Sequence, residues 1–456
     1  MSRYIFLIII LFLVACTNSD KKEIAQNNNT EVKNNSTINE YARFISGIDT
    51  KEFEEIQKKD FYKNYANAIG TNWNYFYLNQ MALIKTWSIN NNITNVNDTN
   101  TLFYPFSGPD YPFAESFFPY AKNYVFIGLE NIGRIPNFKN YSDLQIEKYL
   151  YEFSNSLTEF FQNGYFTTKN MKKNFKNPDM NGIVHPLIFF ITRTGNELIN
   201  LNNIVIDKFG QPVVVDRFNS MENRLKGLKI TFKSKYGKKN LYYIQVDLSN
   251  ENFIDHPELY TFISNFKEKN IFLKSASYLL QNDDFSLFRD FLFSQCTKIL
   301  QDDSGFSYKF LKKKNSDISI YGKYNHTLNI FKKYEQKDLQ DAYNTLKPQK
   351  LPFRFGYNIP FEETALIFAK KTKAKSINYP YYKIQFQMSW KKQKTDTFDS
   401  YLQPVSFFFD EGYYKYTSGY FTNIEKAKKS LSVIRKKYPD AFIIEINEFS
   451  KKVIDD

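Results

Sequence analysis

The sequence predicts a mixed α/β or α+β protein in which a large domain precedes a small β-α-β-β-α-β domain. Segments with helical periodicity alternate with strand-like apolar runs through most of the chain. At 456 residues the chain is longer than one typical domain. Its 46 Phe and 34 Tyr raise the aromatic share to 18%, which supplies ample material for packed cores.

The first residues have the pattern of an export signal. Arg3 supplies a positive charge, and residues 4–14 form an apolar run that is too short to span a bilayer. The run ends in LVAC, in which small Ala15 precedes Cys16. This ending resembles the bacterial lipobox, which implies a signal peptide over residues 1–15 and a lipid attached to the Cys16 thiol. The alternative is an ordinary signal peptide with an incidental cysteine.

The lipobox resemblance implies a lipid-anchored protein of the cell envelope. Thr17 after the cysteine favours the outer membrane, facing the periplasm. Residues 16–39 are rich in Asn, Lys, Ser and Thr, so they predict a disordered tether. The net charge of +13 comes from lysines spread along the chain, which argues against a nucleic-acid partner. Anionic envelope polymers and lipid head groups suit this charge, unless the lysines serve solubility alone.

Residues 40–358 are predicted to form one mixed α/β domain. Ser142 and Gln145 make a capping box at the start of an amphipathic helix that Gly164 ends. Cys296 falls in an apolar helical stretch, where a buried and inert thiol is expected. Further strands are predicted at residues 187–192, 212–218, 228–233 and 241–248, and further helices at residues 257–269 and 284–300.

The C-terminal part is predicted to be a separate small domain. Prolines and lysines accumulate before it, so residues 359–380 are predicted to be a linker. A helix opens at Asn423 and carries Ala427, Leu431 and Ile434 on one face. The remaining elements are strands at residues 381–390, 413–420 and 441–446, an excursion at 398–405 and a tail at 448–456. The pattern predicts an open sheet with helices on one side.

The segment YKYTSGYFTNIEKAKKSLSVIRKKYPDAFIIEI resembles the second half of a SPOR (sporulation-related repeat) domain. YYKIQF at residues 381–386 is similar to the first strand of that domain, with Gln385 where the family commonly has Gln. The Gly that usually follows is missing, since Gln387, Met388 and Ser389 stand there. The resemblance covers residues 381–447 and implies binding of peptidoglycan glycan strands on the exposed face of the sheet.

Residues that suit glycan binding are aromatic rings, amides and hydroxyls, because sugars offer apolar ring faces and many hydroxyl groups. Since side chains alternate along a strand, the candidates cannot all share one face. For each tyrosine, packing between the sheet and the helix is the alternative. The candidates are Tyr382, Gln385, Gln387, Tyr416, Ser418 and Tyr420.

Several phrases of the large domain resemble a family of exported bacterial proteins of unknown function. They include LFYPFSGPDYPFAESFFPYAKNYVFIGLE at residues 102–130 and FLKSASYLLQ at residues 272–281. The first phrase predicts a strand at 102–106, a tight loop, a helix at 113–120, and a second strand at 124–129 that ends at an acidic residue. That is the plan of a Rossmann-like nucleotide or S-adenosylmethionine site.

The loop of this phrase runs from Ser107 to Asp110, and the acidic residue is Glu130. Gly108 is the loop's only glycine, and Pro109 lacks the N–H that a phosphate would use. A structural turn is therefore the favoured interpretation, and the Rossmann-like site is the alternative.

Other groups of reactive residues are weaker candidates. Asp302 and Asp303 suit acid/base chemistry or cation binding, but the Ser and Gly after them favour a solvated turn. Lys274 with the neighbouring serines resembles a Ser/Lys nucleophile pair only superficially. No metal site or cofactor is predicted, because none of the three histidines has a second ligand at metal spacing: His185, His256 and His326.

Two classes of function remain open from the sequence. In the first, the chain is an envelope lipoprotein that binds peptidoglycan through its C-terminal domain. In the second, the large α/β domain is an enzyme that acts on a cell-wall or nucleotide-type substrate. The first is favoured because the sequence contains no P-loop, GxSxG or HExxH motif. Candidate residues for the second are Ser107, Asp110, Glu130, Lys274, Asp302 and Asp303.

Overall fold

The computed structural model describes most of the chain beyond the N-terminal segment. The described residues are 37–96, 100–165, 182–218, 224–314, 316–357, 364–371, 380–402, 404–410, 413–446 and 451–454. The predicted signal peptide, Cys16 and nearly all of the predicted tether lie outside these residues. Within the described residues, no helix combines the length and the apolar character needed to cross a membrane.

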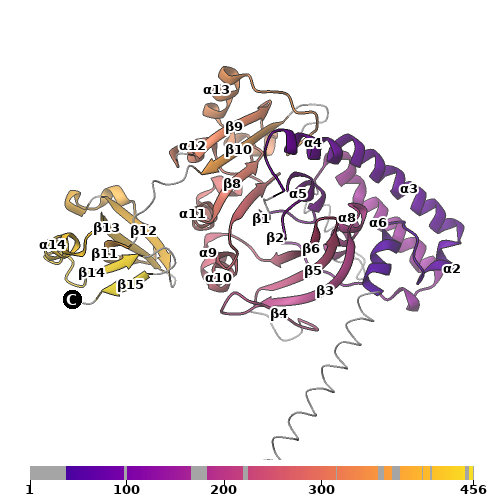
Figure 1. Cartoon of the computed structure of the whole chain (residues 1–456), viewed down its shortest axis with the longest axis horizontal. Coiled ribbons are helices and arrows are strands. Elements are labelled where there is room, and N and C mark those ends of the chain that lie inside the picture. The colour runs from indigo at the N-terminus through magenta and orange to yellow at the C-terminus, as the bar shows by residue number, and fades with distance from the viewer. Residues whose placement is uncertain are drawn as a thin grey trace, which may run out of the picture.

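A ten-stranded mixed sheet forms the centre of the large domain (Figure 1). Its strands are β1 (Thr101–Pro105), β2 (Asn123–Gly128), β3 (Glu197–Ile206), β4 (Pro212–Val214), β5 (Lys226–Ser234), β6 (Gly237–Gln245), β7 (Lys269–Leu273), β8 (Cys296–Gln301), β9 (Ser316–Gly322) and β10 (Ala365–Lys371). Their order across the sheet is β4-β3-β5-β6-β2-β1-β7-β8-β10-β9. The five central strands, β6-β2-β1-β7-β8, are parallel, and the strands outside them pair antiparallel.

The central strands have the order of a Rossmann-like sheet. In chain order the parallel strands are β1, β2, β6, β7 and β8, so their spatial order corresponds to 3-2-1-4-5. The chain first adds strands on one side of β1 and then crosses to add β7 on the other side. The switch point between β1 and β7 is where open α/β sheets form ligand crevices, at the carboxyl ends of the strands.

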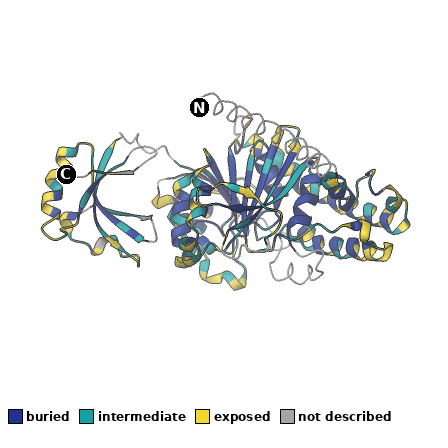
Figure 2. Ribbon diagram, turned by 90° about the horizontal axis from the view of Figure 1, so that it is seen from below, coloured by how far each residue is buried: buried dark blue, intermediate teal, exposed yellow. Residues whose placement is uncertain are grey.

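Helices cover both faces of this sheet, which lies buried between them (Figure 2). Tyr104 and Phe126 belong to the apolar cluster of one face, whereas Phe103 and Val125 belong to the other, as strand alternation requires. The first face is covered by α3 (Asp60–Phe76), α4 (Ala82–Asn90), α5 (Tyr111–Phe117), α6 (Asp143–Asn163) and α8 (Val184–Arg193). The second is covered by α9 (Asn250–Asp255), α10 (Pro257–Ser264), α11 (Ser286–Gln295), α12 (Tyr308–Lys313) and α13 (Lys337–Leu346).

Several sequence-based element predictions are confirmed and others are corrected. The capping box of Ser142 and Gln145 opens α6, and Gly164 ends it with φ +77°. The strand predicted at 187–192 is wrong, because these residues lie in α8. This helix is buried on nearly all sides, so its sequence is a continuous apolar run that has no helical periodicity. The helices predicted at 257–269 and 284–300 end earlier, and β7 and β8 occupy their last residues.

The predicted linker at 359–380 is also corrected, because it contains β10. This strand pairs with β8 on one side and β9 on the other, and its first five residues are buried. The prolines at 352, 360 and 380 lie outside β10, so the proline-rich composition of the surrounding sequence did not reveal this strand. The large domain therefore continues to Lys371.

A second, five-stranded sheet forms the C-terminal part (Figure 1). Its elements are β11 (Tyr381–Ser389), β12 (Val405–Asp410), β13 (Tyr413–Phe421), α14 (Ile424–Ile434), β14 (Phe442–Ile446) and β15 (Lys451–Ile454). The order is β12-β13-β11-β14-β15, with every pair antiparallel. The predicted helix packs through Ala427, Leu431 and Ile434, as expected. The first predicted helix is replaced by two short 3-10 turns, and β15 lies in the predicted tail.

Candidate functional site

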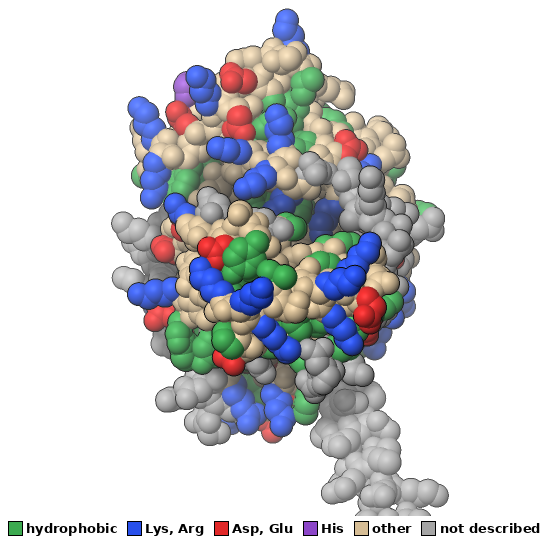
Figure 3. Space-filling view, turned by 90° about the vertical axis from the view of Figure 1, so that its left-hand side faces the viewer, with side chains coloured by type: hydrophobic (Ala, Val, Ile, Leu, Met, Phe, Trp, Pro, Cys, Tyr) green, Lys and Arg blue, Asp and Glu red, His purple; other side chains and the backbone are tan. Residues whose placement is uncertain are grey.

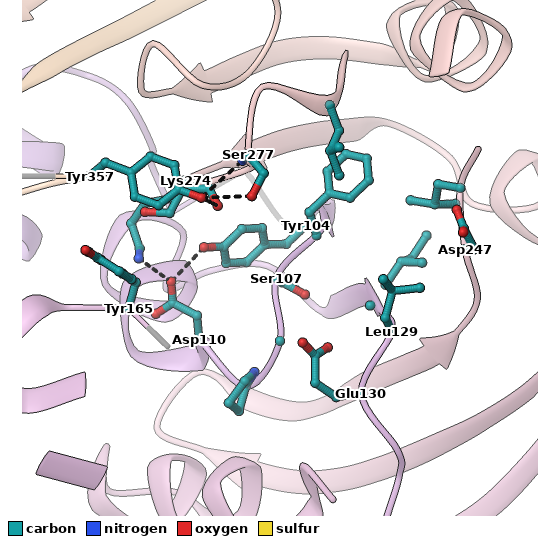
Figure 4. Close-up of a pocket in the computed structure, with 18 of the residues that line it drawn as sticks. Tyr104, Ser107, Asp110, Leu129, Glu130, Tyr165, Asp247, Lys274, Ser277 and Tyr357 are labelled. Atoms are coloured by element: carbon teal, nitrogen blue, oxygen red, sulfur yellow. Dashed lines mark hydrogen bonds and ion pairs between the residues drawn. The ribbon is translucent and has the colours of Figure 1, made fainter. Parts of the chain in front are cut away.

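A cavity of about 460 Å³ opens at the carboxyl edge of the parallel strands, beside the switch point of the large sheet (Figure 4). The loops after β1, β2, β6 and β7 line it. Their polar residues are Ser107, Asp110, Glu130, Asp247, Lys274, Ser275 and Ser277. An apolar wall is formed mainly by Phe106, Leu279, Phe285, Leu328, Ile330 and Phe331.

A buried ion pair lies at one end of the cavity. Lys274 Nζ is 2.7 Å from Asp110 Oδ2, and the Tyr104 hydroxyl donates to the same oxygen at 2.7 Å. Lys274 also donates to the Gly164 carbonyl at 2.8 Å and lies 4.4 Å from the centre of the Phe113 ring. The Lys274 and Asp110 side chains are only 1% and 5% exposed. Burial raises the pKa of Asp110 to about 6, although the lysine charge opposes this effect.

Three buried polar atoms at the cavity have no hydrogen-bond partner among the described residues. They are Ser107 Oγ, Asp110 Oδ1 and Ser275 Oγ. Buried polar groups in folded proteins nearly always have a partner, so each exception calls for an explanation. A ligand in the cavity would provide partners for these atoms.

The backbone around the cavity is held in sparsely populated conformations. Phe106, Ser275, Ser277 and Tyr278 all have positive φ, between +53° and +60°. Such conformations cost of order 1–3 kcal/mol each and persist only where the surroundings enforce them. Their concentration in the loops after β1 and β7 is typical of a functional site.

The loop after β8 enforces this conformation on the loop after β7. Asp302 Oδ2 accepts the Ser275 N–H at 2.7 Å, and Ser304 Oγ accepts the Ala276 N–H at 2.7 Å. From the other side, the Tyr357 hydroxyl accepts the Ser277 N–H at 3.2 Å and donates to the Ser275 carbonyl at 2.7 Å. The strained loop is therefore fixed before any ligand arrives.

Asp302 and Asp303 do not form the solvated turn that the sequence favoured. Asp302 is fully buried and also accepts the Ser304 N–H at 2.9 Å, whereas Asp303 accepts the Tyr278 hydroxyl at 2.5 Å. Burial raises the pKa of both, with that of Asp303 reaching about 7 because the Asp302 charge adds to it. Neither carboxylate lines the large cavity, so both are positioning residues rather than members of the site.

Replacing Asp303 with asparagine tests this burial. Because the folded-state pKa of Asp303 is raised from 3.8 to about 7, the wild-type protein loses stability as the pH rises through that window. An asparagine side chain can accept the hydrogen bond from the Tyr278 hydroxyl but does not ionise. We expect Asp303→Asn to gain stability relative to wild type by roughly 1–4 kcal/mol between pH 4 and pH 8, measured by urea unfolding. A difference that does not change with pH would contradict the shift.

Glu130 stands at the carboxyl end of β2, as predicted. The Tyr243 hydroxyl donates to the Glu130 carbonyl at 2.8 Å and lies 3.3 Å from Glu130 Oε2. Gly128 leaves room for this carboxylate, since a Cβ there would lie 2.6 Å from Oε2. The structure thus brings together four of the six predicted large-domain residues, Ser107, Asp110, Glu130 and Lys274.

Asp247 was missed from the sequence, and Ser275 and Ser277 were considered only as partners of Lys274 in a superficial Ser/Lys pair. Asp247 follows β6, one strand beyond β2, and its place at the end of a predicted strand was the signal that could have identified it. Ser275 sits beside Lys274, but only the fold brings this segment next to the loop after β1.

The C-terminal glycan-binding candidates divide between the two faces of their sheet. Ile384 and Phe386 pack on the α14 side, so Gln385 between them points to the opposite face, which we call the open face. Tyr381 shares that face with Gln385, and the Tyr420 ring lies 4.6 Å from the Tyr381 ring. Gln385 and Tyr420 therefore lie on the open face, although Gln385 is only 9% exposed.

The other four candidates lie off the open face, and an outward position is wrong for the two that are buried, Tyr416 and Ser418. Tyr416 is fully buried against Phe398 at 5.1 Å between ring centres. The hydroxyl of Ser418, also buried, donates to the Leu402 carbonyl at 2.8 Å. The remaining two are displaced by pairing: Tyr382 packs partly into the helix-side core, and Gln387 follows a register shift and bonds to Gln393.

Cys296 is buried as predicted, although it lies in a strand and not in the predicted helix. Its thiol is buried at the start of β8, and burial raises its pKa to about 12, so it is inert. The part of the chain that the structure describes contains no cluster of three or more His, Cys, Asp or Glu side chains that would hold a metal ion. On the face shown in Figure 3, lysine and arginine side chains are scattered among other residues.

The chain was compared with known proteins at three levels. No protein-family model, no curated protein and no solved structure matches it significantly.

Proposed function

We propose that the large domain binds a nucleoside-type ligand in the cavity at the switch point of its sheet. The single observation that carries this proposal is the position of the cavity, at the carboxyl ends of β1, β2, β6 and β7 in a sheet of Rossmann-like order. Ligands of open α/β sheets bind at this place irrespective of the chemistry that follows.

The lining of the cavity suits the parts of a nucleoside. An acidic residue at the end of the second strand binds ribose hydroxyls in Rossmann-like sites, and Glu130 has this position. Phe106, Phe285 and Phe331 offer apolar surface for a base. A volume of about 460 Å³ falls within the ordinary range for small-molecule sites.

The carboxylate of Glu130 gives a direct test. We expect Glu130→Gln to weaken adenosine binding by about 1–3 kcal/mol, because a charged acceptor for the ribose hydroxyls becomes a neutral one. Titration calorimetry on the full chain measures the change. Glu147→Gln, on the exposed side of α6, is the matched control and should bind as wild type does. Equal binding by wild type and Glu130→Gln would reject Glu130 as a ribose ligand.

For the C-terminal part we propose binding of peptidoglycan glycan strands, as the SPOR resemblance implies. Support comes from the strand order and from the single helix on one face of the sheet. On the open face, Lys383 Nζ donates to Ser406 Oγ at 2.5 Å, and Ser406 Oγ lies 2.9 Å from Thr417 Oγ1. Lys383 and Ser406 of this row are partly exposed and, with the paired rings of Tyr381 and Tyr420, offer both partners that a sugar needs, whereas Thr417 is buried. In this proposal the lipid on Cys16 holds the protein beside its cell-wall ligand.

Two tyrosines with similar exposure make a matched test of glycan binding. Tyr420, on the open face, is 47% exposed, and Tyr401, beside Asp399 and Tyr438, is 46% exposed. We expect Tyr420→Ala to weaken cosedimentation with purified sacculi by about 1–3 kcal/mol through loss of stacking, and Tyr401→Ala to leave it unchanged. Gln385→Ala should weaken it as well. If the wild-type protein does not cosediment with sacculi or with peptide-free glycan, the binding proposal fails.

A further inference from the structure

The cavity at the switch point is rich in acceptors and carboxylates. Three carboxylates line it, those of Asp110, Glu130 and Asp247, against one ammonium group, that of Lys274; no arginine is among the described lining residues. This acidic lining is unusual in a chain whose net charge is +13. The lone cation is already bound to Asp110 Oδ2 and to the Gly164 carbonyl.

The loop after β1 has few backbone donors left for a phosphate. The Ser107 N–H donates to the Ile127 carbonyl, and the Asp110 N–H donates to the Ser107 carbonyl. Pro109 has no N–H, and the Tyr111 N–H donates to the Pro109 carbonyl. The Gly108 N–H is therefore the only backbone donor left in residues 107–111, all of which the structure describes. Phosphate sites, in contrast, present several N–H groups together.

The loop after β7 does not replace these donors. The N–H groups of Ser275, Ala276 and Ser277 donate to Asp302, Ser304 and Tyr357. The unpartnered atoms at the cavity are instead oxygens, of which Asp110 Oδ1 and Ser107 Oγ belong to side chains that are more than nine-tenths buried. A carboxylate oxygen accepts hydrogen bonds and attracts positive charge, and it repels phosphate.

We propose that the cavity takes a nucleoside ligand that carries a positive charge and no phosphate. This inference rests on the proposed function and defines the ligand class within it. Ribose hydroxyls on the ligand donate to the unpartnered oxygens, and a sulfonium charge beside the ribose is attracted by the three carboxylates. Nucleoside di- and triphosphates and dinucleotides are disfavoured, because their phosphates would face three carboxylates, and only the Gly108 N–H and the hydroxyls of Ser107 and Ser275 are shown as unpaired donors among the described residues.

Titration of the full chain with three adenosine compounds tests the inference. S-adenosylmethionine carries a sulfonium charge, S-adenosylhomocysteine lacks the sulfonium methyl group and its charge, and ADP carries phosphates. We expect S-adenosylmethionine to bind about tenfold more tightly than S-adenosylhomocysteine, and ADP to bind at least about a hundredfold more weakly than S-adenosylmethionine at low salt. Asp247→Asn should reduce the preference for the sulfonium compound. Asp317→Asn, an exposed change on the distant edge strand β9, should leave it intact.

The possible results distinguish a failure of this inference from a failure of the proposed nucleoside binding. Equal binding of the two S-adenosyl compounds would overturn the assignment of positive charge. Tighter binding of ADP than of either compound would overturn the exclusion of phosphate and would leave nucleoside binding in place. If none of the three compounds nor adenosine binds, the proposed function itself is overturned.

Discussion

Replacing Lys274 with methionine is expected to destabilise the large domain by about 3–5 kcal/mol. The lysine is the charged partner of buried Asp110, at 2.7 Å, and methionine fills a similar volume without charge. Its removal leaves a carboxylate that only the Tyr104 hydroxyl stabilises. Guanidinium unfolding at pH 8, where Asp110 is ionised, measures the loss.

A double variant separates the lost charge from the lost packing. In Lys274→Met/Asp110→Asn no charge remains uncompensated, so most of the stability should return. The penalty of the single variant should also shrink as the pH falls, because burial raises the Asp110 pKa to about 6 even beside the lysine, loss of the lysine raises it further, and protonation removes the charge. A double variant as unstable as the single one would show that packing, and not the ion pair, accounts for the loss.

Replacing Gly356 with alanine is expected to cost about 2–5 kcal/mol and to weaken ligand binding. Gly356 has φ +69°, and a Cβ there would lie 2.3 Å from Asp302 Oδ2 and 2.8 Å from Asp302 Cβ. Asp302 is fully buried and holds the Ser275 N–H through that oxygen. The methyl group must therefore displace the group that fixes the strained loop of the cavity.

The control for this change is Gly195→Ala. Gly195 also has a positive φ, +82°, but open space surrounds the position of its Cβ. We expect a cost of about 1–2 kcal/mol from the left-handed backbone alone and no effect on adenosine binding. Thermal unfolding and calorimetry on both variants measure the two effects. Similar losses in both variants would mean that Asp302 can move aside without consequence.

Helices and strands with a local spacing or capping signal were predicted well from the sequence. The helix of Ser142 and Gly164, the β1-loop-helix-β2 unit and the α14 face of Leu431 depend on local spacing and capping, and the structure has all three. Elements buried on every side were predicted poorly. A continuous apolar run lacks periodicity, so α8 was assigned the wrong structure.

The candidate site was predicted in part for the same reason. Ser107, Asp110 and Glu130 belong to one local strand-loop-helix-strand unit, so the sequence places them within reach of one another. Asp247 and Ser275 are more than a hundred residues away along the chain and join the site only because β6 and β7 lie in the same parallel sheet. Outward positions on the C-terminal sheet were likewise uncertain, because the register shift after Gln385 breaks alternation.

The sequence by itself determined the helical and strand segments with a polar side, the capping residues, and the presence of reactive side chains at strand ends. Only the tertiary structure decided that β10 belongs to the large sheet and that Asp302 turns inward and accepts the Ser275 N–H. It also decided that Lys274 forms an ion pair with Asp110. The physical reason is that periodicity and capping act over a few residues, whereas strand order and buried charge pairing depend on segments far apart in the chain.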